Sequence, residues 1–255
     1  MEVNRDSVLC DEDVLHQLWR ATAPYKRHSI LGDNGLTEAV HGLINTGQAL
    51  PLHEFPVLSL HGVTATKGYD APSLKALGDS LRTDAGTIRF ESDADFARNI
   101  AWLDRPGIGS RVGPPFAVLH RSWDDRYFLS NGNGSHHLAA IYRQVKEQKR
   151  SFTLTGTLTR LTINSRRRDY VLEQCYPLIM RKGVALSLAT TVRQLALHVD
   201  VADIILKPFS RDEHAVFYLG RDNRRADATY TVVKELAPAG SVFDLWTYLK
   251  GLPAG

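Results

Sequence analysis

The spacing of apolar residues changes at a glycine-rich turn near the middle of the chain, and this change restricts the fold most. Before the turn, Phe116–His120 and Arg126–Ser130 are strand-like runs around a polar tip at 122–125, which is typical of a hairpin. After Asn131-Gly-Asn-Gly134 the period becomes that of a helix, because Leu138, Ile141, Tyr142 and Val145 recur at i, i+3, i+4 and i+7. A strand pair that leads directly into a helix predicts an α+β fold, with a compact mixed sheet and helices packed on it.

The remaining segments predict a mixture of helices and strands on both sides of this centre. The expected helices are 13–21, 36–44, 72–81, 93–104 and 242–249, the helix after Gly134 continues to 150, and 170–180 and 190–206 are helical in part. The expected strands are 51–62, 87–90 and 152–163, the last being one strand or a hairpin about Gly156. A turn is expected at 32–35, and 214–219 with 228–233 is expected to form a hairpin around the basic loop 220–227.

The length of the chain allows one large core or two modest ones. It has 255 residues, of which 43% are hydrophobic. We expect a single domain over 1–255, with an N-terminal elaboration (1–95), a core segment (96–150) and a C-terminal α+β elaboration (151–255). The alternative is two domains that divide near residues 151–165.

Composition excludes several classes of protein. The apolar runs are far shorter than the roughly 20 residues that a membrane helix needs, so no membrane partner is expected. The acidic residues near the start do not have the charged-then-apolar order of a secretory signal. With only Cys10 and Cys175, the chain predicts neither a disulfide framework nor a cysteine-rich zinc module, and a cytoplasmic protein is expected.

Positive charge is concentrated in one part of the chain. The net charge is +3, but the segment from Arg143 to Arg168 has eight basic residues against one acidic residue and carries +7. A second basic group, which includes Arg224 and Arg225, follows in the C-terminal third. These groups are either solvated surface or contacts for a phosphate-bearing or protein partner. The candidate contacts are Arg166, Arg167, Arg168, Arg224 and Arg225.

The turn at residues 131–134 and the helix after it form the one candidate site. The first N–H groups of a helix lack internal partners and the helix dipole is positive there, so the backbone can hold an anion. Gly132 and Gly134 would allow close approach, Ser135 is the expected N-cap, and His136 and His137 would add side-chain donors. Adjacent helical residues diverge by about 100°, so the two imidazoles are not expected to bind one metal. The alternative is a tight turn followed by two exposed histidines.

The segments 115–120, 126–130 and 132–140 resemble the core of the ParB/sulfiredoxin superfamily. In that superfamily a strand pair leads into a Gly-x-[His/Arg]-Arg-x-x-Ala type of helix start that binds nucleotide phosphates. Gly134-Ser-His-His137 falls on this motif, with Ala140 at the small-residue position. The chain departs from it twice, with Ser135 in place of the reactive cysteine of sulfiredoxins and His137 in place of a phosphate-binding arginine. Arg143 or Arg121 could supply the missing positive charge.

Two functions follow from these observations. The first is a protein that binds nucleotide or nucleic-acid phosphate. The corresponding enzyme would be a phosphotransferase or nuclease with His136 and His137 as catalytic residues. The second is a non-catalytic module whose basic segments dock a protein partner. No cofactor is indicated. The acidic residues Glu91, Asp93, Asp95 and Asp104 either cap the helix at 93–104 or supply a metal ligand or general base.

Overall fold

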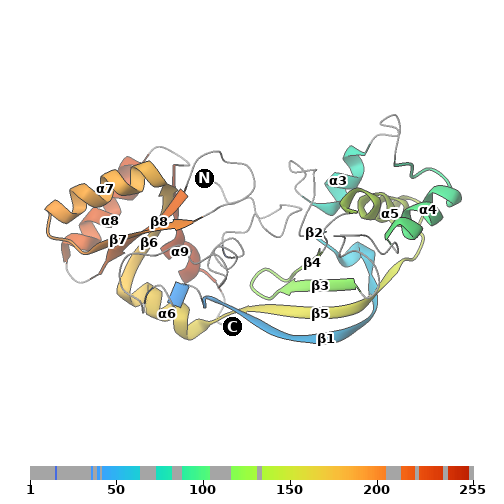
Figure 1. Cartoon of the computed structure of the whole chain (residues 1–255), viewed down its shortest axis with the longest axis horizontal. Coiled ribbons are helices and arrows are strands. Elements are labelled where there is room, and N and C mark those ends of the chain that lie inside the picture. The colour runs from blue at the N-terminus through green and yellow to red at the C-terminus, as the bar shows by residue number, and fades with distance from the viewer. Residues whose placement is uncertain are drawn as a thin grey trace. The chain divides into compact units, whose positions relative to one another are not determined.

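The chain folds as an α+β protein, which confirms the fold class expected from the sequence (Figure 1). The computed structural model describes residues 42–63, 73–81, 88–103, 116–130, 134–204, 214–221, 224–237 and 241–252, together with Leu15, Leu36, Ala39 and Val40. The described residues divide into two compact units. The central unit comprises residues 46–162, and the terminal unit comprises the described residues of 14–45 and 163–255.

The central unit is built on a five-stranded sheet with the strand order β1-β5-β3-β4-β2. Its strands are β1 (Ile44–Pro56), β2 (Gly62–Val63), β3 (Phe116–Arg121), β4 (Arg126–Ser130) and β5 (Thr153–Ile163). Its helices are the 3-10 turn η3 (Val57–Ser59), α3 (Leu74–Ser80), α4 (Asp93–Leu103) and α5 (Ser135–Glu147). The sheet is mixed, because β3 pairs antiparallel with β4 but parallel with β5, and β2 pairs parallel with β4.

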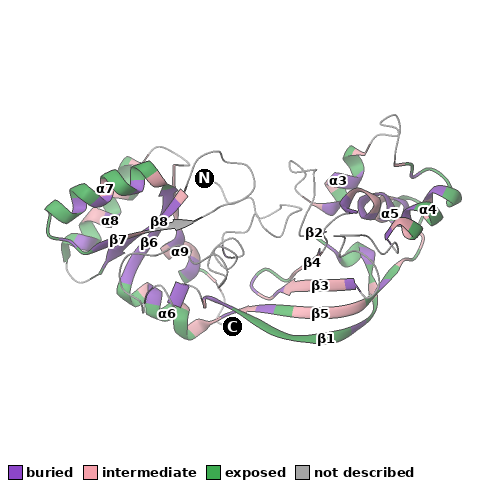
Figure 2. Cartoon of the chain, viewed as in Figure 1, coloured by how far each residue is buried: buried purple, intermediate pink, exposed green. Residues whose placement is uncertain are grey.

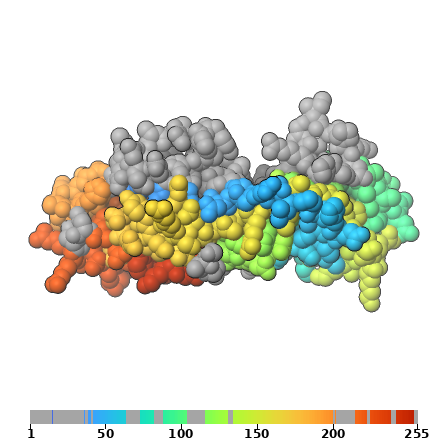
Figure 3. Space-filling view, turned by 90° about the horizontal axis from the view of Figure 1, so that it is seen from below, coloured from blue at the N-terminus to red at the C-terminus, as the bar shows by residue number. Residues whose placement is uncertain are grey.

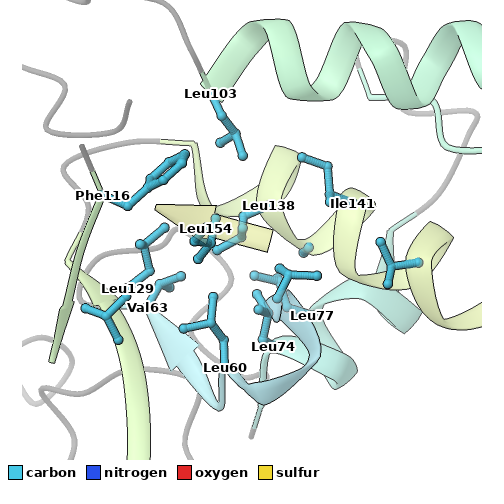
Figure 4. Close-up of a cluster of buried hydrophobic side chains, with 14 of the residues drawn as sticks. Leu60, Val63, Leu74, Leu77, Leu103, Phe116, Leu129, Leu138, Ile141 and Leu154 are labelled. Carbon is cyan, nitrogen blue, oxygen red and sulfur yellow. The ribbon is translucent and has the colours of Figure 1, made fainter. Parts of the chain in front are cut away.

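The core of the central unit lies between its helices and one face of the sheet (Figure 4). Alternate residues of β3 and β4, such as Val118 and Leu129, point to this face, since side chains along a strand alternate in direction. α5 contributes Leu138 and Ile141 at helical spacing, and Leu77 comes from α3. All five side chains are at most 1% exposed. Burial of the apolar stripe of α5 therefore determines where this helix packs.

The terminal unit has a four-stranded sheet in the order β7-β8-β6-β9, and the neighbouring strands pair antiparallel. Its strands are β6 (Cys175–Arg181), β7 (Val199–Ile204), β8 (His214–Gly220) and β9 (Val242–Asp244), and its helices are α6 (Ser165–Gln174), α7 (Lys182–Gln194), α8 (Arg224–Leu236) and α9 (Leu245–Lys250). α7 and α8 cover the face that carries Leu178 and Phe217. Residues of the opposite face, such as Ile179 and Val216, are also buried, and α6 and α9 lie on that side (Figure 1).

β1 is an edge strand of the central sheet. It is exposed along most of its length, and only Ile44 and Leu52 are buried (Figure 2). In Figure 3, β1 (blue) lies at the surface of the central unit. The boundary between the units falls in the first residues of β1 and at the last residue of β5, so the central unit is an insertion in the sequence of the terminal unit.

The expectations for the centre of the chain are confirmed. The hairpin is β3 and β4, with a turn at 122–125, and the helix after Gly134 is α5. The helices expected at 72–81 and 93–104 are α3 and α4.

The expected N-cap of α5 was Ser135, and this expectation was wrong. Gly134 is the N-cap, in the left-handed conformation, and no side chain caps the helix there.

Of the other expectations, some are wrong, some are confirmed wholly or in part, and some fall outside the described residues. Residues 228–233 belong to α8 and not to a hairpin, β5 is one continuous strand, and 242–244 form β9 ahead of the closing helix. Residues 88–90 form no strand. Leu36, Ala39 and Val40 are helical, as expected for 36–44, but a turn follows at Gly42 and Ile44 already begins β1. The segments 170–180 and 190–206 are helical in part, followed by β6 and β7. The turn at 32–35 and the helix at 13–21, apart from helical Leu15, lie outside the described residues.

Candidate functional site

The first turn of α5 lies against the last turn of α4. Gly134 has a φ of +82°, a conformation that favours glycine, and a Cβ at this position would come 2.7 Å from Cζ3 of Trp102. The Trp102 ring also stacks on the His137 ring, with centroids 4.2 Å apart and an angle of 15° between the planes. Trp102 therefore packs over the start of α5 and fixes the plane of the imidazole.

Two buried amide side chains connect His137 to α4 and to the segment before it. Asn99 is 2% exposed and Gln144 is fully buried. Nδ1 of His137 lies 2.9 Å from Oδ1 of Asn99, and Nδ2 of Asn99 donates to the Arg89 carbonyl at 2.8 Å and to Oε1 of Gln144 at 3.5 Å. Nε2 of Gln144 donates to the Ser92 carbonyl at 3.1 Å. Within the helix pair, His137 is thus held by a polar chain that crosses an otherwise apolar interface.

The start of α4 is fixed by reciprocal capping. Oδ2 of Asp95 accepts from the Ser92 hydroxyl at 2.8 Å and the Ser92 N–H at 3.1 Å, while the Asp95 N–H donates to the Ser92 hydroxyl oxygen at 3.1 Å. The hydrogen bond from the Ser92 hydroxyl is the largest cause that lowers the pKa of Asp95; burial opposes it, and backbone N–H groups and Arg98 add to it. Asp95 is therefore an ionised cap of α4.

The other acidic residues considered as metal ligands or general bases contact groups other than His137. Asp93 forms an ion pair with Arg150, and the Glu91 carbonyl accepts from Gln148. Asp104 lies outside the described residues. Among the described residues, no three His, Cys, Asp or Glu side chains are grouped as ligands of a metal ion.

The predicted phosphate-binding residues are only partly brought together. Gly134, Ser135, His136 and His137 form the first turn of α5, with Ser135 buried and its hydroxyl 3.4 Å from Nδ1 of His136. Gly132 lies outside the described residues.

Arg143 is directed away from the start of α5. It lies six residues further along the helix than His137, about 9 Å along the axis. Its guanidinium bonds to Glu147 at 2.8 Å and to the carbonyls of Gly78 and Leu81 at 3.4 Å, and lies over the Phe90 ring. Arg143 therefore ties α5 to the end of α3.

Arg121, the other arginine considered, lies at the far end of the hairpin. Ala117 pairs with Ser130, near the start of α5, so Arg121 is four residues or roughly 13 Å along β3 from that point. Its side chain is 3% exposed, bonds to Asp124 and lies over the Phe128 ring. Arg121 therefore stabilises the tip of the hairpin.

The two basic groups occupy different layers of the terminal unit. Arg166, Arg167 and Arg168 lie in the first turn of α6, and Arg224 and Arg225 in the first turn of α8. Arg168 is largely buried by bonds to Asp169 and to the Leu252 carbonyl, whereas Arg166, Arg167, Arg224 and Arg225 are exposed. Because α6 and α8 lie on opposite sides of the sheet, the two groups do not form one continuous basic face.

Sequence reasoning missed an aromatic and charged cluster in the terminal unit. Tyr176 stacks on Tyr230 with centroids 4.1 Å apart, and Trp246 contacts both rings edge-on. The Tyr176 hydroxyl donates to Asp227 at 2.7 Å, and the Tyr230 hydroxyl donates to Asp244 at 2.8 Å. The sequence did contain a signal for this cluster, since Tyr230 and Lys234 are four residues apart. That spacing brings two side chains together only on a helix, and 228–233 was expected to be a strand.

The electrostatics of this cluster indicate a structural role. Burial, and then the hydrogen bond to Asp227, raise the pKa of Tyr176; burial also raises the pKa of Tyr230, with its hydrogen bond to Asp244 acting in the same direction. Burial would raise the pKa of Asp244, but hydrogen bonds from Lys234, Thr247 and Tyr230 lower it further than burial raises it. The phenols remain protonated and the carboxylate ionised, so this is a satisfied network and not an acid–base pair.

Two further histidines flank Tyr127 in the central sheet. The His120 ring stacks on the Tyr127 ring at 4.3 Å, and its Nε2 lies 2.8 Å from Oδ1 of Asp125. Nδ1 of His61 accepts from the Tyr127 N–H at 3.2 Å. Burial is the main cause that lowers the pKa of His61, and the nearby Arg126 adds to it.

These features define an α+β protein in which a histidine-bearing helix start is braced by a buried amide network. The chain belongs to a family of unknown function, DUF6685, whose model matches residues 51–255. The match begins within β1 and includes α4, α5 and the whole run from α6 to α9. No curated protein and no solved structure matches the chain. None of the helices in the described ranges has the length and apolar character needed to cross a membrane.

Proposed function

We propose that the first turn of α5 binds the phosphate group of a nucleotide or nucleic acid. The observation that carries this proposal is the position of His137. Its ring is held at the start of a helix by the stack on Trp102 and by the bond to Asn99. The first backbone N–H groups of α5 and the positive end of its dipole favour an anion at the same place. The ParB/sulfiredoxin resemblance implies a nucleotide phosphate at this helix start.

His136 and His137 are the residues of this site that could exchange a proton with a bound phosphate, as a phosphotransferase or nuclease requires. Imidazole is charged only in part near neutral pH, so these residues give weaker phosphate binding than an arginine would. A cytoplasmic location, where nucleotides are abundant, belongs to the same proposal.

A thermal shift experiment tests the proposal. Because a ligand that binds only the folded state stabilises it, a nucleotide at 100 times its Kd would add about 2.7 kcal/mol to the free energy of unfolding. We expect ATP, ADP, AMP or a short oligonucleotide at millimolar concentration to raise the Tm. His137→Ala should remove most of the shift, whereas His53→Ala, on the exposed edge strand β1, should leave it unchanged. Absence of a shift with the whole panel would refute the proposal.

The alternative function, a module whose basic segments dock a partner, is favoured by one observation. Both basic groups lie in the first turn of a helix, where the helix dipole disfavours positive charge, so a negatively charged partner would relieve this repulsion. The groups lie on opposite sides of the terminal sheet, and we therefore expect one partner to contact one group.

Charge reversal at each group tests the alternative. The double variants Arg166→Glu/Arg167→Glu and Arg224→Glu/Arg225→Glu serve as matched controls for each other. Binding is measured as a pull-down from lysate with each variant as bait. Abolition of binding by one pair only agrees with this alternative, and binding that resists both reversals contradicts it.

A further inference from the structure

The polar chain behind His137 determines which of its two ring nitrogens carries the proton. Asn99 and Gln144 lie among the buried apolar side chains of α4 and α5, where an amide without hydrogen bonds would cost about 1–3 kcal/mol. Both amides are satisfied, and this fixes their orientation. Nε2 of Gln144 is the donor to the Ser92 carbonyl, so its Oε1 is the atom that faces Asn99.

The orientation of Asn99 follows in the same way. Its Nδ2 has two hydrogens, and the two acceptors that face it are the Arg89 carbonyl and Oε1 of Gln144. Its Oδ1 is therefore the atom next to His137, and an amide oxygen can only accept a hydrogen bond. Nδ1 of His137 must then be the protonated nitrogen, an assignment made from the hydrogen-bond network.

We propose that Asn99 is a positioning residue, which holds neutral His137 in the Nδ1–H tautomer so that Nε2 is the nitrogen that exchanges a proton with the phosphate ligand. The role of Nε2 toward a ligand rests on the proposed function, whereas the tautomer does not. In the proton transfer, the Nε2 lone pair takes a proton from the ligand or from an attacking hydroxyl or water, and the same proton leaves from Nε2 to the departing oxygen. Nδ1–H remains bonded to Asn99 in both states.

The arrangement explains why polar groups are buried at this helix interface. In a free imidazole, exchange between tautomers lets either nitrogen carry the lone pair. The bond to Asn99 removes this freedom, and the stack on Trp102 removes rotation of the ring out of its plane. A site that uses one nitrogen repeatedly gains from both restraints, since less reorganisation accompanies each proton transfer.

Long-range ¹H–¹⁵N correlation spectra of the full chain with ¹⁵N-labelled histidine test the tautomer. At alkaline pH, where the imidazole is neutral, we expect the Nε2 resonance of His137 to lie in the downfield position of a lone-pair nitrogen and Nδ1 in the position of a protonated one. His137→Gln identifies the signal by its loss. The reverse assignment in the unmodified protein would overturn the inference.

Two variants separate positioning from packing. Asn99→Leu removes the acceptor, so His137 should shift toward the Nε2–H tautomer. Gln144→Leu is the matched control, because it also removes a buried amide from the same interface. Nδ2 of Asn99 still donates to the Arg89 carbonyl at 2.8 Å in this variant, so the Asn99 oxygen stays next to His137 and the tautomer should not change. Circular dichroism confirms that each variant is folded. Equal effects of the two variants would contradict a positioning role for Asn99.

Titration with inorganic phosphate separates this inference from the proposed function. If phosphate displaces the Nε2 resonance more than the Nδ1 resonance, both stand. If the tautomer is as inferred and phosphate at millimolar concentration moves neither resonance, the phosphate site is refuted while the role of Asn99 stands. If phosphate binds and the lone pair is on Nδ1, the positioning role fails alone.

Discussion

Gly134 is under two constraints, and both predict that a side chain there destabilises the protein. Its φ of +82° is strained for any residue with a Cβ, and that Cβ would overlap with Trp102. Strain in the left-handed region costs about 1–3 kcal/mol, and overpacking adds a similar amount. We therefore expect Gly134→Ala to lower the free energy of unfolding by about 2–6 kcal/mol, measured by urea denaturation.

Gly183→Ala is the matched control for this substitution. Gly183 lies in α7, and a Cβ there meets no atom within 4 Å. Alanine in a helix loses less conformational freedom on folding, so this variant should gain about 0.4–1 kcal/mol. A similar loss of stability in both variants would show that the conformation and packing of Gly134 do not explain its effect.

His61 makes the stability of the central sheet depend on pH. Its Nδ1 accepts from the Tyr127 N–H, and protonation of Nδ1 removes that acceptor. Burial, with a contribution from Arg126, lowers its pKa below 6.5 in the folded state, so the unfolded chain binds more protons in this range. Stability from His61 is therefore present above pH 6.5 and lost as the pH falls through the folded-state pKa. Urea denaturation from pH 7.5 to 5 should show a smaller loss for His61→Asn than for the unmodified protein; an unchanged pH dependence would contradict this.

At the scale of single residues, the sequence predicted where the site begins but not what holds it. Gly134 and His137 are identifiable because glycine and polar residues at a strand-to-helix turn have local physical meaning. Asn99 and Trp102 are more than 30 residues earlier in the chain, and only the packing of α4 against α5 brings them to His137. No local pattern distinguishes a buried asparagine with satisfied hydrogen bonds from an exposed one.

At the scale of elements, Asp244, the last residue of β9, links this strand to α8 and α9. It caps α9 through the Thr247 N–H at 3.0 Å, accepts from Tyr230 of α8, and forms an ion pair with Lys234 at 2.5 Å. Asn164 caps α6 through the Arg167 N–H at 3.1 Å and serves as the comparison. We expect Asn164→Ala to cost about 1 kcal/mol, as an ordinary N-cap does. Asp244→Ala should cost about 2–3 kcal/mol, because the Tyr230 hydroxyl and the Lys234 ammonium also lose their acceptor. Equal costs in urea denaturation would show that the contacts to α8 add nothing.

α8 also shows why an element can be mispredicted from local sequence. Ala228-Thr-Tyr-Thr-Val-Val233 is rich in residues that favour strands, and its alternation is that of a half-buried strand. The segment is nevertheless helical, because Ala226 and Tyr230, four residues apart, are the positions that the packed face needs. Tertiary burial at helical spacing therefore overrides the local propensity. α5 was predicted correctly because its propensity and its apolar spacing agree.

At the scale of the whole molecule, the two segments of the terminal unit that connect to the central unit lie side by side. The Asn164 N–H donates to the Leu43 carbonyl at 2.8 Å, and Nδ2 of Asn164 donates to Oδ1 of Asn45 at 3.2 Å. Adjacent ends are what an inserted unit requires, since the host then needs no rearrangement to accommodate it. Each unit also has its own buried cluster, around Leu77 in the central unit and around Leu178 in the terminal unit. The α+β class was predictable from the sequence, whereas the insertion depends on contacts between 42–45 and 163–164 that no local pattern encodes.

Separate cores predict that the two units unfold in separate steps. Leu77 and Leu178 are both at most 1% exposed, and replacing such a leucine by alanine costs about 2–5 kcal/mol. For a unit of about 100 residues this lowers the Tm by roughly 8 °C or more. In differential scanning calorimetry of the full chain, Leu77→Ala should move one transition down and leave the other in place, and Leu178→Ala should do the reverse. If both variants instead shift one common transition, the chain is a single cooperative domain, because loss of packing in either core then unfolds both.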